Sequence, residues 1–341
     1  MTRYIRPLVQ FGPARPQGAY TLAGGWCWFT HVEVLSRVDS AIVLSASNLE
    51  KEELEALTAA RTPIAELSFD VPRLMGILNV TPDSFSDGGR HQTPHDAVKE
   101  AMKMVAKGAD LIDIGGESTR PGAVTVTPED EIERTAPAIK AIRDVGVVTP
   151  ISIDTRKASV GHAAIAAGAD IVNDVSGFTY DPALAVSCLK TGTPVCVMHA
   201  QGDPATMQDE PYYEDVLLDV YDFLKIQIEG LVSLGIPRHS IIADPGIGFG
   251  KNQTHNLKLM NRISLFHSLG VPVLLGASRK RFIGTIGNEP IADRRAAGSV
   301  GVALAAIAQG VQLIRAHDIA EHKQAIALWQ ASVTQDLSEI G

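Results

Sequence analysis

From residue 73 onwards, short apolar runs of strand length alternate with amphipathic segments of helix length. The apolar runs are continuous rather than alternating, which is typical of parallel strands that are covered on both faces. The predicted strands span residues 73–79, 110–115, 148–154, 170–173, 193–198, 240–243, 272–275 and 311–315. The predicted helices lie near residues 94–108, 128–144, 156–167, 181–190, 214–235, 253–268, 293–309 and 318–331.

Eight strand–helix pairs in about 260 residues predict an α/β fold of the (β/α)8 TIM-barrel type, for which about 250 residues is typical. A doubly wound open sheet is the alternative. No GxGxxG motif follows an early strand, which weakens a dinucleotide-binding interpretation. Two predicted helices end in Gly-Ala-Asp, at Gly108 and Gly168, and each glycine is expected to turn the chain directly into the next strand.

Residues 1–70 do not follow this alternation. They are predicted to form an N-terminal extension of unknown role, packed on a catalytic barrel of residues 71–341. Within the extension, residues 26–35 are expected to form a strand, and Asn48 to cap a short helix in residues 49–61. No candidate chemistry stands out in this part of the chain.

The composition of the 341 residues, 45% hydrophobic and 20% charged, fits a soluble globular protein with a sizeable core. A net charge of −9 argues against a general nucleic-acid binder. The three cysteines, Cys27, Cys188 and Cys196, have neither zinc-site spacing nor the pattern of a disulfide framework. No signal-peptide core or membrane-spanning apolar run is found, so a cytoplasmic protein without membrane partners is expected.

Polar or glycine residues follow nearly every predicted strand. The first example is GILNVTPDSFSDGG at residues 76–89, where a strand ends at Asn79 and a polar, glycine-ended loop follows. In a parallel barrel the carboxyl ends of all strands meet on one face, so these side chains are predicted to form one site. They are Asn79; Asp113, Glu117, Ser118, Thr119 and Arg120; Asp154; Asn173 and Asp174; Met198 and His199; Asp244, Phe249 and Lys251; Ser278, Arg279 and Lys280; and Arg315, His317 and Asp318.

Taken singly, several of these residues also have a purely structural interpretation. Asp113 is a candidate structural hydrogen-bonding group inside its strand, and Asp174 is a candidate turn cap. His199 fits a satisfied histidine at the barrel rim, and Met198 is more often a core residue than a ligand contact. The functional interpretation depends on the whole set, because one topology brings all of it together.

The residue types at the strand ends suggest a ligand. Two carboxylates, an amide and an ammonium suit a flat, nitrogen-rich heterocycle, and they are supplied by Asp154, Asp244, Asn173 and Lys280. Opposite charges at close range are expected to keep the carboxylates ionised and Lys280 protonated. The planar guanidinium of Arg315 can stack on a ring. Asn79, Arg315 and His317 suit an anion such as pyrophosphate, and Mg2+ bound by Asn79 would help to neutralise it.

The chain resembles the dihydropteroate synthase family. NVTPDSFSDGG, DIGGESTRPGA, ISIDT, VNDVSG, VMH, DPGIGFGK, GASRK and RAHD all look like that family's signatures, in its order, across residues 73–331. The resemblance implies a (β/α)8 barrel, usually homodimeric. It implies condensation of 6-hydroxymethyl-7,8-dihydropterin pyrophosphate with 4-aminobenzoate, giving 7,8-dihydropteroate and pyrophosphate in folate synthesis. Sulfonamides, as aminobenzoate mimics, are expected inhibitors.

The resemblance also implies roles for individual residues. The pterin would be held by Asp154, Asn173, Met198, Asp244, Lys280 and Arg315. The pyrophosphate would be bound by Asn79, Arg315 and His317, with Asn79 also a ligand of Mg2+. The 4-aminobenzoate subsite would be shaped by Phe85, Thr119, Arg120, Pro121, Phe249 and Ser278, together with Lys280. The catalytic groups would be Asp154, Lys280, Arg315 and His317, none of them as a covalent nucleophile.

Two other functions fit the barrel less well. A pterin-binding methyltetrahydrofolate methyltransferase would share the carboxylates and the amide, but it has less use for STRPG, SRK and RAHD. A non-catalytic paralogue would be expected to lose Asp154, Lys280 or Arg315, and all three are present.

Overall fold

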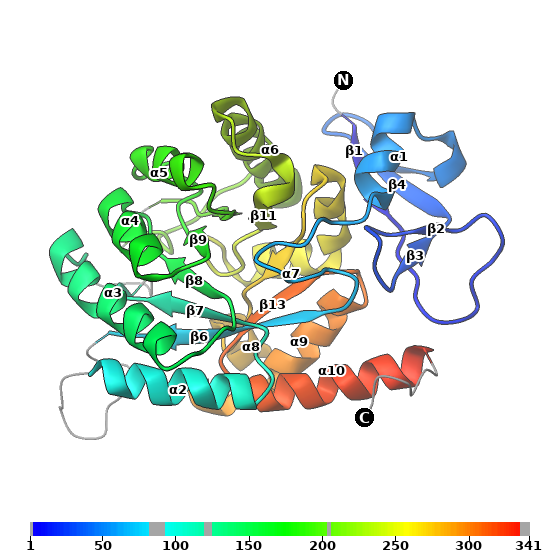
Figure 1. Cartoon of the computed structure of the whole chain (residues 1–341). Helices are drawn as coiled ribbons and strands as arrows, with labels where there is room; N and C mark the ends of the chain where they lie inside the picture. The colour runs from blue at the N-terminus through cyan, green and yellow to red at the C-terminus, as the bar shows by residue number, and fades with distance from the viewer. Residues whose placement is uncertain (1–2, 82–92, 119–124, 203–205, 335–341) are drawn as a thin grey trace.

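The computed structural model describes residues 3–81, 93–118, 125–202 and 206–334 (Figure 1). Eight parallel strands lie side by side in the order β11-β10-β9-β8-β7-β6-β13-β12. A parallel bridge between Ala243 and Val273 joins the two outer strands, and the Ala243 amide donates to the Pro272 carbonyl at 2.9 Å. The sheet therefore closes on itself. The predicted (β/α)8 barrel is confirmed, and the open-sheet alternative is wrong.

The barrel strands lie within about two residues of most of the predicted positions. They are β6 (Arg73–Asn79), β7 (Leu111–Gly115), β8 (Ile151–Asp154), β9 (Ile171–Asp174), β10 (Val195–Met198), β11 (Ile241–Asp244), β12 (Leu274–Leu275) and β13 (Leu313–Ala316). The shortest is β12, because Pro272 has no amide hydrogen to donate and the Val273 amide donates to the side chain of Gln312 at 2.9 Å.

The helices form the outer layer around the barrel (Figure 1). They are α2 (Pro94–Ala106), α3 (Pro128–Asp144), α4 (Ala158–Ala167), α5 (Ala183–Thr191), α6 (Val216–Leu234), α7 (Gln253–Asn261), α8 (Arg281–Ile286), α9 (Ala296–Ile307) and α10 (Ile319–Thr334). The helix predicted for residues 253–268 is interrupted at Arg262, whose backbone (φ −126°, ψ 31°) is not helical, and a 3-10 helix, Ile263–Leu269, follows. The short α8 was not predicted.

Local sequence explains where the helices begin and end. Thr93 caps α2, its hydroxyl accepting from the Asp96 amide at 3.3 Å, and Pro94 occupies the first turn, where no amide hydrogen is needed. Gly108 and Gly168 have φ values of +94° and +112°. Both glycines turn the chain from helix to strand as predicted, because the left-handed region is open to glycine.

The amino-terminal end of the barrel is closed by apolar side chains. Seven strands each contribute one inward residue to this floor: Met75, Leu111, Ile171, Cys196, Ile242, Leu274 and Leu313. Ile64 and Phe69, from the segment that precedes β6, pack against them. Apolar side chains fill this end, and the charged side chains of the barrel strands lie towards the other end.

The N-terminal residues form a three-stranded antiparallel sheet of β1 (Tyr4–Pro7), β4 (His31–Leu35) and β5 (Ile42–Ser45), with β4 in the centre. A second pair, β2 (Tyr20–Thr21) and β3 (Trp28–Phe29), lies beside it. The single strand predicted for residues 26–35 is therefore two strands. Helix α1 (Lys51–Thr58) is capped by Glu50, whose amide donates to the Glu53 carboxylate at 3.2 Å. The predicted cap, Asn48, is wrong because it belongs to a 3-10 turn, Ala46–Asn48.

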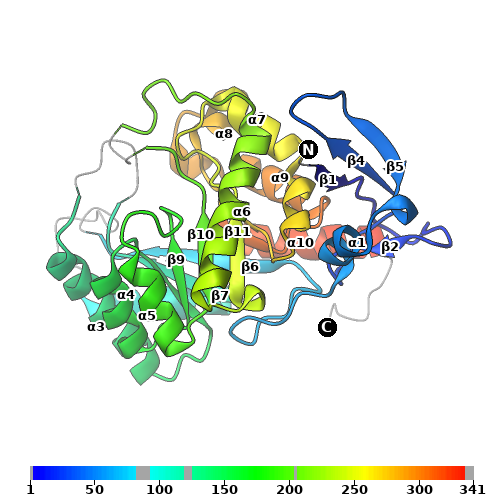
Figure 2. The same cartoon turned by 90° about the horizontal axis from the view of Figure 1, so that it is seen from above.

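This N-terminal part packs on the side of the barrel away from α3, α4 and α5 (Figure 2). Arg37 pairs with Asp219 and Asp222 of α6 at 2.8 and 2.7 Å, and the Tyr4 hydroxyl donates to Asp222 at 2.8 Å. The buried Arg61 donates to the carbonyls of Ala56 and His267. The division at residue 70 and the role of the extension stay predictions.

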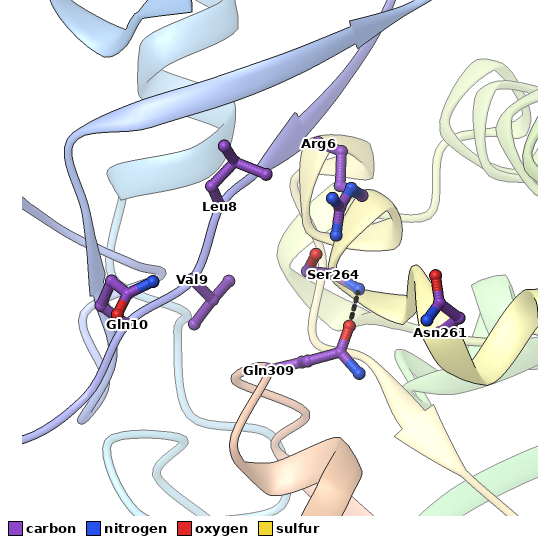
Figure 3. A pocket seen from close by; sticks show the side chains of 7 residues that line it. All are labelled: Arg6, Leu8, Val9, Gln10, Asn261, Ser264 and Gln309. Carbon is purple, nitrogen blue, oxygen red and sulfur yellow. Dashed lines mark hydrogen bonds between the residues drawn. The ribbon is translucent and has the colours of Figure 1, made fainter. Parts of the chain in front are cut away.

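A cavity of about 400 Å³ lies where the N-terminal part meets the barrel (Figure 3). It is lined by Arg6, Leu8, Val9, Gln10, Asn261, Ser264 and Gln309. The one charged residue of this lining, Arg6, donates to Glu33 at 2.6 Å. The cavity is lined by none of the predicted site residues.

No helix in the described ranges combines the length and the apolar character that crossing a membrane requires. All three cysteines are buried and unpaired.

Candidate functional site at the carboxyl ends of the barrel strands

At the next inward positions charged and amide side chains appear on several strands, although β6 keeps an apolar residue, Ile77, and β10 has Met198. Side chains two residues apart share one face of a strand, so the residues that follow the floor by two positions lie directly above it. These residues are Asp113 after Leu111, Asn173 after Ile171, Met198 after Cys196, Asp244 after Ile242, Gly276 after Leu274 and Arg315 after Leu313. The fold thus brings the predicted pterin residues together inside one end of the barrel.

Four neighbouring strands place their end residues side by side. The parallel register pairs Asn79 with Gly115, Gly115 with Asp154, and Asp154 with Asn173. A Cβ at Gly115 would lie 3.5 Å from Asn79 Oδ1 and 3.6 Å from Asp154 Cβ. The glycine therefore leaves the space into which the side chains of Asn79 and Asp154 extend.

Arg315 is the central cation of the site. Its Nε donates to Asp113 Oδ2 at 2.6 Å and its Nη2 donates to Asp154 Oδ2 at 2.7 Å. Asn173 Nδ2 donates to the same Asp113 oxygen at 3.4 Å. Asp113 is fully buried, and its Oδ1 has no hydrogen-bond partner among the described residues.

Asp113 is among the strand-end residues predicted to form the site, but the sequence assigns it no role toward a ligand and leaves a structural interpretation open. Asp113 follows the floor residue Leu111 by two positions, and this spacing is the signal that places its side chain inside the barrel.

Asp244 and Lys280 belong to β11 and to the connection after β12, so they lie on the side of Arg315 away from Asp113 and Asp154. Asp244 Oδ1 accepts from the Gly246 amide at 2.7 Å. The Lys280 ammonium lies 4.0 Å from the centre of the Phe249 ring, a distance at which the ring face attracts a cation. Phe249, one of the predicted aminobenzoate residues, thus lies beside Lys280, one of the predicted pterin residues.

Ser278 and His317 form a second pair at the rim. The Ser278 hydroxyl accepts from the His317 amide at 3.2 Å and lies 3.0 Å from Nδ1 of the same histidine. A hydroxyl that donates to Nδ1 leaves the ring proton on Nε2. In that tautomer His317 presents a neutral N–H donor from Nε2, and in either tautomer the Ser278 hydroxyl is engaged with the histidine.

Met198 belongs to a small apolar cluster rather than to the main core. Its buried partners are Val175, Met207 and Phe249, with Ala200 packed against them. The cluster joins residues that follow β9, β10 and β11, and it forms an apolar wall beside the polar groups. Met207 is a member that the sequence interpretation did not single out.

His199 takes the structural role that was its alternative interpretation. Its Nδ1 lies 2.8 Å from the buried ammonium of Lys251. Lys251 also donates to the carbonyls of Gly246 and Phe249, both at 2.9 Å. This lysine thus shapes the loop that carries Phe249. Asp174 likewise caps a turn, accepting from the amides of Ser176 and Phe178.

Burial changes the ionisation of the site. It raises the pKa of Asp154 to about 7, although Arg315 opposes the rise, and it raises the pKa of Asp244 to about 6. It lowers the pKa of Lys280 to about 8 and that of His317 to about 3. Loss of solvation is the largest effect on each of these pKa values. At pH 7 the values still leave Asp244 mostly ionised and Lys280 mostly protonated, as expected, whereas Asp154 is close to its midpoint.

Some predicted residues lie outside the described ranges. These are Phe85, Thr119, Arg120 and Pro121. In the part of the chain that the structure describes, no group of three or more His, Cys, Asp or Glu is arranged to hold a metal ion. Mg2+ takes few protein ligands when phosphate oxygens and water complete its octahedron. A single amide oxygen from Asn79, next to Asp154 across Gly115, is compatible with such a site.

Residues 75–317 match the family of pterin-binding enzymes. A relative from Escherichia coli strain K12, named dihydropteroate synthase, is 43% identical over 268 residues, which cover 79% of this chain and 94% of the relative.

Two solved structures resemble the fold. The Yersinia pestis dihydropteroate synthase with a sulfonamide drug complex has a TM-score of 0.75 and 42% identity, over 80% of this chain and 98% of that one. The Xanthomonas albilineans enzyme with 4-aminobenzoic acid also has a TM-score of 0.75 and 42% identity, over 80% and 97% of the two chains.

The barrel fold and the family match thus define a pterin-binding barrel enzyme. With these similarities over most of its length, the chain belongs to the dihydropteroate synthase family.

Proposed function

We propose that this protein condenses 6-hydroxymethyl-7,8-dihydropterin pyrophosphate with 4-aminobenzoate, releasing 7,8-dihydropteroate and pyrophosphate, as a step of folate biosynthesis. The observation that carries the proposal is the position of Arg315 between Asp113 and Asp154, with Asn173 bound to the same carboxylate. This arrangement offers a cation, acceptors and an amide to one flat heterocycle.

The pterin is held by groups that match its edges. Asp154 and Asp244 accept from ring N–H and amino groups, Asn173 contributes its amide, and Lys280 donates to a ring carbonyl or nitrogen. The side chain of Met198 lines the apolar wall. Arg315 lies against the ring with its guanidinium plane.

The leaving group is bound at the rim. Arg315 supplies a positive charge, and His317 donates from Nε2 because its Nδ1 faces Ser278. Asn79 is the proposed protein ligand of Mg2+, which neutralises pyrophosphate charge when it is bound.

The proposed reaction breaks the C–O bond to pyrophosphate first, and the electron pair leaves with the pyrophosphate. The cation on the exocyclic methylene is delocalised into the pterin ring, where Asp154 stabilises it. A preorganised charge of this kind is often the largest catalytic contribution. The arylamine then forms the C–N bond and loses a proton. No residue acts as a covalent nucleophile.

The aminobenzoate is proposed to bind beside Phe249 and Ser278, with Phe85, Thr119, Arg120 and Pro121 completing its subsite. Because sulfonamides have the shape and charge of this substrate, they are proposed to compete for the same place. A homodimer in the cytoplasm is proposed as the working form, and light scattering of the purified chain would test the dimer.

The decisive experiment measures pyrophosphate release by the purified chain given the pterin pyrophosphate and Mg2+, with and without 4-aminobenzoate. We expect release that is coupled to the formation of dihydropteroate. Binding of the pterin without release would contradict the proposal and would favour a methyltransferase-like or non-catalytic pterin binder.

A further inference from the structure

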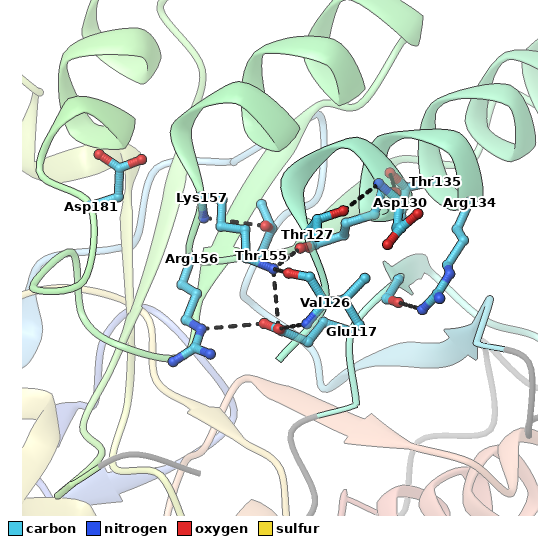
Figure 4. A network of polar contacts seen from close by, with 12 residues as sticks. Glu117, Val126, Thr127, Asp130, Arg134, Thr135, Thr155, Arg156, Lys157 and Asp181 are labelled. Carbon is cyan, nitrogen blue, oxygen red and sulfur yellow. Dashed lines mark hydrogen bonds and ion pairs between the residues drawn. The ribbon is translucent and has the colours of Figure 1, made fainter. Parts of the chain in front are cut away.

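Four charged side chains are buried together next to the site, and the proposed mechanism uses none of them (Figure 4). The side-chain exposures are 7% for Glu117, 1% for Glu131, 7% for Arg156 and 5% for Lys157. Arg156 Nε lies 3.2 Å from Glu117 Oε2, and Lys157 Nζ lies 3.1 Å from Glu117 Oε1 and 2.5 Å from Glu131 Oε2. Two cations thus face two carboxylates.

Such a network is a poor way to gain stability. Removing charges from water costs several kcal/mol per ion by general experience, and apolar side chains of similar volume often serve as well or better. Glu131 illustrates the cost, because its Oε1 is buried without a partner among the described residues. The network instead fixes the relative positions of the groups that its hydrogen bonds join. Lys157 Nζ donates to Glu117, Glu131 and the Val126 carbonyl, which uses all three of its hydrogens.

The ammonium of Lys157 holds both ends of one strand-to-helix connection. Glu117 lies just after β7, and Val126 lies just before α3. The Val126 amide donates to Glu117 Oε1 at 2.9 Å, and the Val126 carbonyl accepts from Lys157 at 2.8 Å. Residues 117 and 126 are thereby fixed to one nitrogen atom. The sequence between them contains Thr119, Arg120 and Pro121, three of the residues predicted to contact 4-aminobenzoate.

The same lysine is tied to the pterin end of the site. It follows Asp154 by three residues, and between them the Thr155 amide donates to the Asn173 carbonyl at 3.0 Å. The Arg156 guanidinium lies 4.1 Å from the centre of the Tyr180 ring, which follows β9. The network therefore links the connections that follow β7, β8 and β9.

Helix α3 contacts the backbone next to Glu117 from outside the barrel. Arg134 Nη1 donates to the Gly116 carbonyl at 3.0 Å. A Cβ at Gly116 would lie 2.7 Å from Thr135 Cγ2 and 3.0 Å from Glu131 Cγ. The backbone next to Glu117 is thus held on two sides, and the position of Glu117 is set by packing as well as by charge.

We propose that Lys157 is a positioning residue for 4-aminobenzoate: through Glu117 and Val126 it sets the distance between the connection after β7 and the pterin-binding end of β8. The proposal rests on the proposed function. It assigns Lys157 a role in the use of the second substrate and none in binding the pterin.

The test compares Lys157→Met with the unaltered full-length chain, varying each substrate in turn with Mg2+ present. We expect the KM for 4-aminobenzoate to rise about 10-fold to 100-fold, since small displacements of positioning groups have effects of that size. The KM and the calorimetric Kd of the pterin pyrophosphate should stay within about 2-fold, well below the tenfold change that 1.4 kcal/mol produces. Lys140→Met is the matched control, because Lys140 pairs with Asp144 on the exposed face of α3 and should change neither KM.

A second variant, Glu117→Gln, keeps the size of the side chain and removes its charge. It should raise the KM for 4-aminobenzoate in the same sense, and adding Lys157→Met to it should cause little further change, because both act through one contact. This variant carries the test if Lys157→Met does not fold.

An unchanged KM for 4-aminobenzoate in both variants would overturn the inference alone. Equal losses for both substrates would also overturn it, since they would indicate a merely structural role. Absence of turnover in the unaltered chain would instead overturn the proposed function, and the inference with it.

Discussion

Arg315 donates through Nε to Asp113 at 2.6 Å, and this carboxylate lies in the interior of the barrel with its second oxygen unpaired among the described residues. The pair determines where the guanidinium can lie, because Asp113 is fully buried on β7. The carboxylates of Asp113 and Asp154 raise the pKa of Arg315 despite its burial, so the cation is permanent.

We therefore expect Asp113→Asn to lower kcat/KM by about 10-fold to 100-fold, because a hydrogen bond to a charged group is worth about 1.5–3 kcal/mol. Asp110→Asn is the control at the other end of the same strand. Asp110 accepts from the Leu74 amide at 2.8 Å and pairs with Arg73 at 3.4 Å. That variant should reduce the melting temperature without changing kcat/KM. An Asp113→Asn enzyme with normal kcat/KM would show that Arg315 does not need this partner.

Lys280 should be essential in its protonated form. Burial lowers the pKa of Lys280 to about 8, with Arg315 adding to the effect and Asp244 opposing it. The ammonium is lost as the pH rises through that value, so kcat/KM should fall above about pH 8. Lys280→Ala, like Asp154→Ala, should abolish turnover while the circular dichroism spectrum stays that of the folded barrel.

The residual activity of Lys280→Arg tests whether deprotonation of residue 280 causes the alkaline fall in kcat/KM, because arginine keeps its charge at alkaline pH. Its pH profile should lose the alkaline fall. A profile that still falls above about pH 8 would assign the titration to another group.

The barrel fold could be predicted from the sequence because the same strand-then-helix pattern recurs along the chain. Eight continuous apolar runs, separated by helices with glycine ends such as Gly108 and Gly168, leave few topologies open. The predictions that are wrong concern single caps and turns. Asn48 is a good helix cap by residue type, but the chain forms a 3-10 turn there, and Glu50 takes the capping position. Short-range preferences of this size, about 1 kcal/mol, are easily outweighed by packing.

The sequence predicts which residues lie in the site better than it predicts their protonation states. The strand-end positions of Asp154, Asp244 and Lys280 follow from the barrel topology alone. Their ionisation depends on solvent exclusion inside the barrel, which no sequence pattern reports. The role of Asp113 could not be predicted for a related reason, since it depends on its contact with Arg315, which is 202 residues away in the chain.

His267 should make the protein sensitive to acid. It is fully buried, its Nε2 lies 3.0 Å from the Gln309 carbonyl, and its Nδ1 has no partner among the described residues. Burial, with Arg61 nearby, lowers the pKa of His267 to about 3. The unfolded chain takes up a proton below about pH 6.5 and the folded chain does not. The stability that His267 provides is therefore complete above about pH 6.5 and is lost as the pH falls towards 3.

Thermal unfolding followed from pH 7.5 to pH 4 would measure this effect. In His267→Gln the slope of unfolding free energy against pH should decrease by up to about 1.36 kcal/mol per pH unit, the value for one proton. His95→Gln, at an exposed position, is the control and should leave the slope unchanged. Equal slopes in His267→Gln and the unaltered chain would mean that other groups dominate acid unfolding.

The space above Gly276 should be needed for the ligand. A Cβ at this position would lie 3.6 Å from Asp244 Oδ2 and 3.9 Å from Arg315 Cδ, which are ordinary contact distances. Gly276→Ala should therefore fold, but its methyl group would occupy the gap between the carboxylate and the guanidinium. Forcing one extra methyl into a filled site costs about 1–3 kcal/mol, so the Kd of the pterin pyrophosphate should rise by about 5-fold to 140-fold.

Gly246→Ala is the contrasting variant, because there the Cβ would lie only 1.9 Å from the His199 carbonyl oxygen and the backbone has a φ of +66°. It should lower the melting temperature as well as the affinity, whereas Gly276→Ala should lower the affinity alone. Calorimetry and thermal unfolding of the two variants separate these effects. Normal pterin affinity in Gly276→Ala would place the heterocycle away from Asp244 and Arg315, and the proposed pterin site would have to be redrawn.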